Sequence, residues 1–262
     1  MSFLESTSLL SLIVVAVCSF LAGLIDALVG GGGLIQLPGL LLSFPKTPIT
    51  FLMGTNKLAA LAGTSISAYQ YGKRVVFNYK VLLAIGLSAA LFSYIGASFF
   101  SLLDINLLRP LILGILVCMF FYTMFKKELG DNNEKEVSFK NQLIKGSFIG
   151  IATGFYDGFF GPGTGSFLVL GFVSVLGFDF LKASAYAKVV NCFTGVGALI
   201  LFVKAGTFIL PLAILMAICN ITGNMVGIRL AFKNGNAFIR KAFLLLVFLL
   251  IVRYAYDIFF RN

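Results

Sequence analysis

The sequence contains no histidine and no tryptophan, and only 11% of its 262 residues are charged. Soluble domains carry about 25% charged and about 45–50% apolar residues, whereas this chain is 59% hydrophobic, with a mean hydropathy of +1.00. These values predict an all-α polytopic membrane protein. At roughly 20 residues per spanning helix, the length allows about eight full spans.

The missing histidine restricts the chemistry that the chain can perform. The four cysteines lie in apolar segments without a CxxC spacing, so we expect no zinc or haem site and no cofactor. A Ser-His pair and a metal hydrolase centre are excluded, and the chain has no GxxxxGK[ST] phosphate loop, which argues against a primary pump. A Ser-Lys pair, formed by Lys57 or Lys188 with Ser65 or Ser184, is the one enzymatic alternative. We therefore expect a protein that is not an enzyme.

The net charge of +10 does not indicate a nucleic-acid partner, because the basic residues cluster in short segments between apolar runs. This is the positive-inside pattern of a membrane protein. Most lysines and arginines fall on the cytoplasmic side if the N-terminus is outside and each half of the chain crosses the membrane an odd number of times. An odd number of crossings would make the two halves inverted copies.

Two rare residue types repeat in one register. Asp26 and Lys57 recur as Asp157 and Lys188, each 131 residues later, in segments that are otherwise apolar. Three glycines keep this offset, at positions 23 and 154, 30 and 161, and 32 and 163. We predict a first transmembrane repeat over 1–125, a polar cytoplasmic linker over 126–145 and a second transmembrane repeat over 146–262.

Each half also contains an apolar segment that is too short to span a membrane as an ordinary helix, at 34–44 and 165–177. Each segment follows a glycine cluster, at 30–33 and 161–165. Glycine and proline interrupt helices, and unpaired backbone at membrane depth is tolerated only inside protein or along a cavity. We therefore predict Gly-broken or re-entrant helices at a substrate cavity. Close helix packing is the alternative explanation for the glycines.

The motifs around these clusters resemble one known family. Residues 30–33 are four glycines, and the later motifs read GTNK at 54–57, GFYDGFFGPGTGS at 154–166 and AKVVN at 187–191. These motifs resemble the TauE/SafE family of sulfite exporters, also called toluene-sulfonate uptake permeases, over essentially the whole chain. The resemblance implies transport of small sulfur-containing anions, such as sulfite and sulfonates, across a bacterial inner membrane.

The residues themselves also favour an anion site. Lysines supply positive charge, and broken helices present free N–H groups and the positive end of a helix dipole. The predicted substrate-binding residues are Lys57, Lys188, Asn56, Asn191, Thr55, Gly31, Gly32, Gly33, Gly163 and Thr164. Asp26 and Asp157 are predicted to form a structural ion pair with Lys188 and Lys57, or to couple transport to protons, because burial disfavours the charged form of a carboxyl group.

Together these observations predict a secondary transporter of small anions that works by alternating access. Its expected partners are a small anionic substrate and the lipid bilayer, and nucleic acid is not expected. A homodimer is one possible oligomeric state. Export is favoured because an anion leaves a negative interior downhill, by about 2.3 kcal/mol per charge at 100 mV. A passive anion channel or an accessory membrane subunit is the alternative function.

Overall fold

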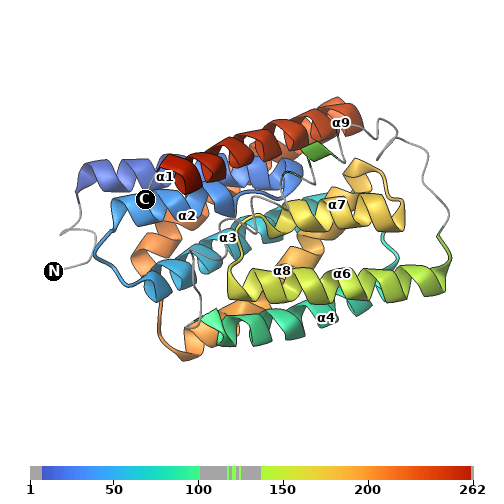
Figure 1. Ribbon diagram of the computed structural model, residues 1–262, viewed down its shortest axis with the longest axis horizontal. Helices are drawn as coiled ribbons and strands as arrows, with labels where there is room; N and C mark the ends of the chain where they lie inside the picture. The colour runs from blue at the N-terminus through green and yellow to red at the C-terminus, as the bar shows by residue number, and fades with distance from the viewer. Residues whose placement is uncertain (1–7, 101–116, 118–119, 122–123, 125–136, 261–262) are drawn as a thin grey trace.

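The structure is a computed structural model that describes residues 8–100, 117, 120–121, 124 and 137–260. The regular secondary structure of these residues is helical, and Figure 1 shows the helices packed side by side as an elongated bundle. The helices are α1 (Leu9–Val29), α2 (Gly33–Ser43), α3 (Ile49–Gly72), α4 (Tyr79–Ser98), α6 (Phe139–Phe159), α7 (Thr164–Leu176), α8 (Phe180–Lys204) and α9 (Leu210–Phe260). This confirms the predicted all-helical class.

Four of these helices are long and apolar enough to cross a membrane: α1, α4, α8 and the Leu210–Leu245 part of α9. Two others, α3 and α6, have 24 and 21 residues, but polar side chains such as Lys57 and Asp157 interrupt their apolar character. The short helices α2 and α7 have 11 and 13 residues, and they begin within the glycine clusters, at Gly33 and Thr164, so they contain the short apolar segments expected from the sequence. The total number of crossings remains a prediction.

Glycines in the left-handed region mark several helix boundaries. Gly30 ends α1 with a φ of 80°, and Gly163 precedes α7 with a φ of 89°. An L side chain is strained in this region, so glycine is the natural residue at these two breaks. Gly235 has a φ of 69° and interrupts α9, so this element is two helices joined at a kink. Most of the predicted linker, 126–136, lies outside the described residues, and α6 already begins at Phe139.

Close contacts at glycines define how the helices run. On α1 and α9, Gly23 faces the Asn220 backbone and Gly227 faces the Leu24 backbone, so these two helices are parallel. On α3, Gly54 meets the backbone of Thr207, three residues before α9, and Gly63 meets the Asn220 side chain of α9, so α3 and α9 are also parallel. Thus α1, α3 and the first part of α9 form one set that runs in a single direction.

A second set runs the opposite way. On α4 and α6, Gly150 meets Ile85 and Gly158 meets Ser93, so these helices are parallel. The helix α8 is parallel to α4, since Phe193 lies on Gly86 and Gly197 on the Ala90 backbone. The two sets meet in opposite directions between α3 and α8, and Figure 1 shows α1 and α6 running in opposite directions.

That antiparallel meeting is visible in two contacts. Gly195 of α8 lies against Leu61 of α3, and Cys192, earlier in α8, lies 3.8 Å from the hydroxyl of Ser65, which comes later in α3. The outside of the bundle carries exposed apolar side chains, as expected for a surface that faces lipid. Leu83, Leu87 and Leu91 of α4, one helical turn apart, are 50%, 61% and 58% exposed.

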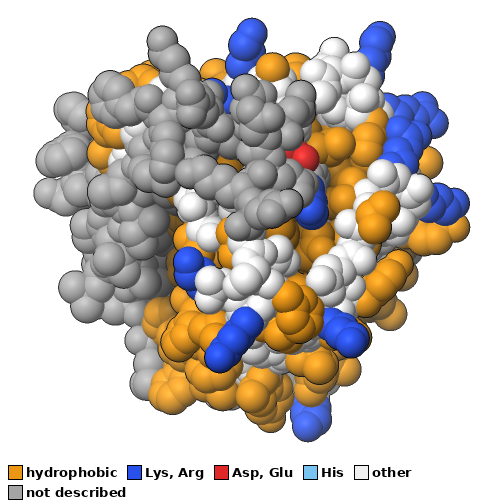
Figure 2. Space-filling view, turned by 90° about the vertical axis from the view of Figure 1, so that its right-hand side faces the viewer, with side chains coloured by type: hydrophobic (Ala, Val, Ile, Leu, Met, Phe, Trp, Pro, Cys, Tyr) orange, Lys and Arg blue, Asp and Glu red, His pale blue; other side chains and the backbone are white. Residues whose placement is uncertain are grey.

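Basic side chains gather at one end of the bundle. Figure 2 looks onto the end at which α6 begins and shows lysine and arginine side chains spread around it, with apolar surface between them. Exposed basic residues there include Lys73 and Arg74 after α3, Lys80 in the first turn of α4, and Lys140 in the first turn of α6. A bundle with an apolar flank and a basic end fits a membrane protein whose basic end lies in the cytoplasm.

The glycines of α6 let it approach α4 closely, which leads to a stability prediction. A Cβ atom at Gly158 would collide with the Ser93 carbonyl oxygen and lie 2.7 Å from the Ala97 nitrogen. We expect Gly158→Ala to lower the free energy of unfolding by about 1–3 kcal/mol, the usual cost of overpacking. Thermal unfolding of the purified protein in detergent measures this loss. Gly72→Ala is the matched control, because its Cβ meets only Phe77 at 3.6 Å. Equal melting temperatures for the two variants would contradict the packing.

Candidate functional site

The two aspartates of the repeated motif lie just before the helix breaks. Asp26 is in the last turn of α1 and Asp157 in the last turn of α6, and both are buried, with 9% and 7% exposure. A carboxylate near the C-terminal end of a helix faces the negative end of the helix dipole and the last unpaired carbonyl groups. Each buried carboxylate therefore requires a cation nearby.

The lysines supply these cations, each from the other half of the chain. Lys57 of α3 places its Nζ 2.6 Å from Asp157 Oδ2 and 2.7 Å from the Asp157 carbonyl oxygen. Lys188 of α8 places its Nζ 3.0 Å from Asp26 Oδ2 and donates to the Asp26 carbonyl oxygen. Each lysine thus neutralises a carboxylate and also caps the end of the broken helix that carries it. These are the two cross-half ion pairs.

The two ion pairs have different surroundings. Lys188 is fully buried, and its partner Asp26 also accepts a hydrogen bond from Thr64 at 3.1 Å. Lys57 is 7% exposed and lines a cavity together with Asp157. The Gly161 backbone gives Lys57 this room, because a Cβ there would come within 3.0 Å of the Lys57 Nζ. The Lys57–Asp157 pair therefore faces open space that the Lys188 ammonium does not reach.

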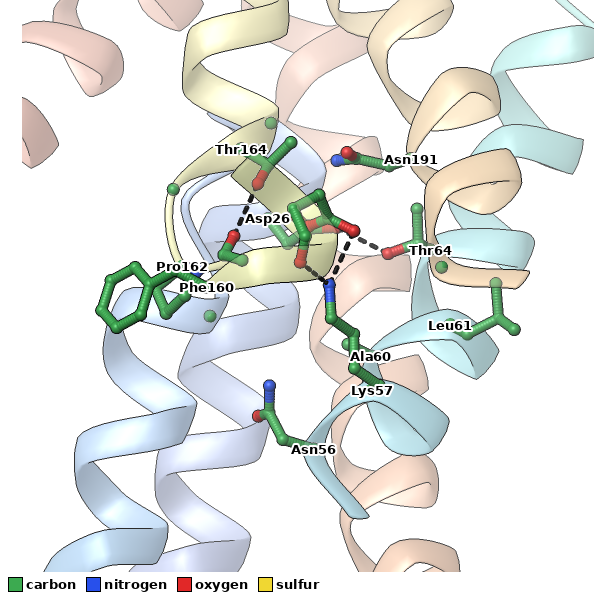
Figure 3. A pocket seen from close by; sticks show the side chains of 17 residues that line it. Asp26, Asn56, Lys57, Ala60, Leu61, Thr64, Phe160, Pro162, Thr164 and Asn191 are labelled. Carbon is green, nitrogen blue, oxygen red and sulfur yellow. Dashed lines mark hydrogen bonds and ion pairs between the residues drawn. The ribbon is translucent and has the colours of Figure 1, made fainter. Parts of the chain in front are cut away.

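The cavity lies where the two helix breaks meet α3 and α8, and has a volume of about 70 Å³. Figure 3 shows Asn56 and Lys57 approaching it from α3 and Asn191 from the opposite side. The break between α6 and α7 forms one wall, through Phe160, Pro162 and the first residue of α7, Thr164. One water needs about 10–15 Å³, so a few waters or a small ion fit, whereas the pockets that bind drug-sized ligands measure about 300–1,000 Å³.

The helix breaks also pack directly on each other. A Cβ at Gly30 would overlap the Gly165 backbone, and a Cβ at Gly33 would lie 3.3 Å from Pro162 Cα. The start of α2 and the start of α7 therefore both reach the cavity, which is lined by Gly33, Gly163 and Gly165. The first N–H groups of a helix have no acceptor within it. Several of these groups donate to carbonyls of the breaks, as Leu34 does to Gly31 and Ser166 to Gly163, so the two helix N-termini present mainly their positive dipole ends to the same small space.

The structure brings most of the predicted site residues to this cavity. Asp26, Asn56, Lys57, Asp157, Asn191, Gly33, Gly163 and Thr164 line it. The other predicted residues lie outside its lining: Gly31, Gly32, Thr55 and Lys188. Thr55 donates to the Phe51 carbonyl at 2.6 Å and accepts from the Ile209 N–H at 2.9 Å, so it joins α3 to α9.

Several further polar contacts hold the site, and the one made by Thr64 was not predicted from the sequence. Thr64 holds Asp26 and lies two helical turns after Lys57, on the same face of α3, a spacing that could have indicated it. Tyr156 donates to the Pro162 carbonyl at 2.7 Å, which holds the break between α6 and α7. Ser166 and Ser184 donate to the last carbonyls of α1, those of Val29 and Leu28.

The serines of the predicted Ser-Lys alternative have other partners. Ser184 is bonded to Leu28, and Ser65 donates to the Leu61 carbonyl at 2.7 Å, while both lysines contact aspartates. In the described part of the chain, no three histidine, cysteine, aspartate or glutamate side chains come together as a metal site requires. The arrangement suits ligand binding through charge and hydrogen bonds.

A buried chain of hydrogen-bonded polar side chains joins α2, α3 and α9. Ser67 donates to Asn224 Oδ1, Asn224 Nδ2 donates to Asn220 Oδ1 at 2.7 Å, and Asn220 Nδ2 donates to Gln36 Oε1 at 2.9 Å. The second half has no matching chain, because the position 131 residues after Gln36 is Phe167. The two halves therefore differ in how their short helices are held.

The amino-acid sequence matches the family model described as "Sulfite exporter TauE/SafE" over residues 15–254. The chain belongs to the TauE/SafE family. The resemblance found in its motifs is therefore confirmed, and the candidate site lies within the region that this family shares.

Curated relatives agree with this assignment. A "Probable membrane transporter protein" of Haemophilus influenzae is 34% identical over 239 residues, covering 91% of this chain and 92% of the relative. ORF9 of a Sinorhizobium species, also described as a probable membrane transporter protein, is 34% identical and covers 92% and 91%. The similarly described YfcA of Escherichia coli is 32% identical and covers 91% and 87%. No solved structure matches the chain. The protein is thus a TauE/SafE-family membrane protein whose relatives are described as transporters.

The burial of Lys188 leads to a prediction about stability. Lys188→Met leaves the Asp26 carboxylate without its cation, and breaking a buried ion pair in this way costs about 3–5 kcal/mol. We expect a clear fall in the melting temperature of the detergent-purified protein. Adding Asp26→Asn removes the uncompensated charge, so the double variant should recover part of this loss. A double variant that is less stable than Lys188→Met would contradict the pairing.

Proposed function

We propose that this protein is a secondary transporter that exports small sulfur oxyanions, such as sulfite or organosulfonates, from the bacterial cytoplasm by alternating access. Membership of a family described as sulfite exporters supports the substrate class. The relatives from Haemophilus influenzae and Escherichia coli, both described as probable membrane transporters, support transport as the activity.

The observation that carries the proposal is the Lys57–Asp157 pair at a small cavity between two helix N-termini. An oxyanion there can accept hydrogen bonds from Lys57 and from Asn56, and it faces the positive dipole ends at the starts of α2 and α7. These groups surround one point from both halves of the chain. The cavity size suits an oxyanion of a few heavy atoms.

The arrangement of the helices supports inverted repeats. The helices α2, α3 and α4 begin at residues 33, 49 and 79, while α7, α8 and α9 begin 131 residues later, at 164, 180 and 210. The set α1, α3 and α9 runs opposite to the set α6, α8 and α4, so each half contributes its fourth helix to the other half's set. Inverted repeats around a site near the membrane centre are typical of transporters that work by alternating access.

Orientation and direction follow from charge. We assign the basic end in Figure 2 to the cytoplasm. A helical bundle fits the bacterial inner membrane, because bacterial outer-membrane proteins of the porin type are β-barrels. The negative interior drives an anion outward by about 2.3 kcal/mol per charge at 100 mV, so export requires no coupled ion.

Flux measurements on proteoliposomes test this function. We expect saturable sulfite efflux that increases with an inside-negative potential. Lys57→Ala should reduce this efflux at least about tenfold, because a charge-assisted hydrogen bond contributes about 1.5–3 kcal/mol. Lys204→Ala, at an exposed lysine in the last turn of α8, is the control and should transport like the wild type.

Other results would contradict particular parts of the proposal. Flux that rises linearly with sulfite concentration would indicate a channel instead of a carrier. Wild-type flux from Lys57→Ala would show that the cavity is not the binding site. The absence of flux for sulfite and for every sulfonate would contradict the proposed substrate class.

A further inference from the structure

The cavity between the two halves contains acceptors as well as donors. The two ion pairs, Lys57–Asp157 and Lys188–Asp26, sum to a formal charge of zero, and the cavity lining itself contains Lys57 with both aspartates but not Lys188. A site built only to attract anions would carry excess positive charge and would not place a carboxylate in the cavity wall. The presence of Asp157 beside Lys57 therefore requires an explanation in terms of the substrate.

Two further acceptors lack partners. The amide oxygens of Asn56 and Asn191 are buried without a hydrogen-bond donor among the described residues, and both side chains line the cavity. Asn56 is only 6% exposed. A buried polar atom without a partner costs about 1–3 kcal/mol, so each of these oxygens favours a ligand that brings a hydrogen-bond donor.

The Lys57–Asp157 contact also favours a ligand that brings a hydrogen-bond donor. A substrate anion that binds Lys57 competes with the Asp157 carboxylate, whose Oδ2 lies 2.6 Å from the Lys57 Nζ. If the substrate only accepts hydrogen bonds, Asp157 is left as a buried anion beside a second anion, and an unpaired buried charge is strongly unfavourable. If the substrate also carries an O–H or N–H group, that group can donate to Asp157. The substrate then sits between lysine and aspartate, and both stay paired.

We propose that the Lys57–Asp157 pair selects monovalent oxyanions that carry their own hydrogen-bond donor, such as hydrogensulfite, sulfamate and hydroxy-substituted sulfonates. Dianions and plain alkyl sulfonates bind poorly, because they offer no hydrogen to Asp157, Asn56 or Asn191. The inference rests on the proposed transport function and defines its substrate class. The Lys188–Asp26 pair has no such role, because Lys188 lies outside the cavity lining and Thr64 already donates to Asp26.

Two monovalent anions of nearly equal size test the selection. Sulfamate and methanesulfonate differ in an amino group against a methyl group, so only sulfamate has an N–H donor. The experiment measures how strongly each anion inhibits sulfite efflux from proteoliposomes that contain the full chain. We expect sulfamate to inhibit at a concentration at least about tenfold lower, the effect of one hydrogen bond to a charged acceptor.

The Asp157→Asn variant assigns the selection to one residue. Its amide can donate to a sulfonate oxygen as well as accept, so the ratio of the two inhibition constants should fall toward one. The homologous Asp26→Asn variant should keep the wild-type ratio. Because the readout is a ratio within each protein, a loss of overall activity in either variant does not affect the comparison.

The outcomes separate this inference from the transport function. Efflux of sulfite with equal inhibition by the two anions in the wild type would overturn the inference and leave transport intact. If Asp157→Asn keeps the wild-type ratio of the two inhibition constants, the assignment to Asp157 is overturned. A ratio near one in Asp26→Asn would overturn it as well. A wild-type protein that moves no sulfur oxyanion would overturn both. The wild-type ratio is decisive alone if Asp157→Asn cannot be purified.

Discussion

The structure depends on the high free energy of an unpaired charge in the interior of a membrane protein. Asp26 and Asp157 lie in the last turns of two broken helices, and each pairs with a lysine from the opposite half of the chain. Neither half can keep its carboxylate paired alone. The two ion pairs therefore bring α1 to α8 and α6 to α3, and they locate the meeting point of the helix breaks.

The same lysines satisfy the backbone at these breaks. A helix that stops inside a membrane leaves carbonyl groups without hydrogen-bond donors. The hydrocarbon core contains no water that could donate to them. Lys57 and Lys188 donate to the carbonyl oxygens of Asp157 and Asp26 as well as to their carboxylates. One side chain thus compensates both the broken helix and the buried charge, so the polar cavity exists inside an otherwise apolar bundle.

Residues that are 131 positions apart in the sequence have different surroundings in the structure. Lys57 faces the cavity, whereas Lys188, at the equivalent position, is fully buried and its aspartate is additionally held by Thr64. Gln36 ties α2 to α9 through Asn220, whereas Phe167 occupies its place in α7. The two short helices are therefore held by different contacts, since Ser166 ties α7 to the Val29 carbonyl at the end of α1.

The sequence predicted those features that depend on rare residues in apolar surroundings. Asp26, Lys57 and their counterparts stand out because charge is scarce, and the glycine clusters indicate where α1 and α6 stop. It did not predict Thr64 or the chain from Ser67 to Gln36, because threonine, serine and asparagine occur widely in such helices and their partners lie far away in sequence. The division of roles between Lys57 and Lys188 depends on burial, which equivalent motifs cannot distinguish.

An experimental structure of the protein in lipid nanodiscs, determined with and without sulfite, tests the central claim most directly. The account predicts sulfite density between Lys57 and Asp157, with the separation of these two side chains increased and the Lys188–Asp26 pair unchanged. Sulfite bound elsewhere, with the Lys57–Asp157 pair closed at its 2.6 Å contact in both structures, would contradict it.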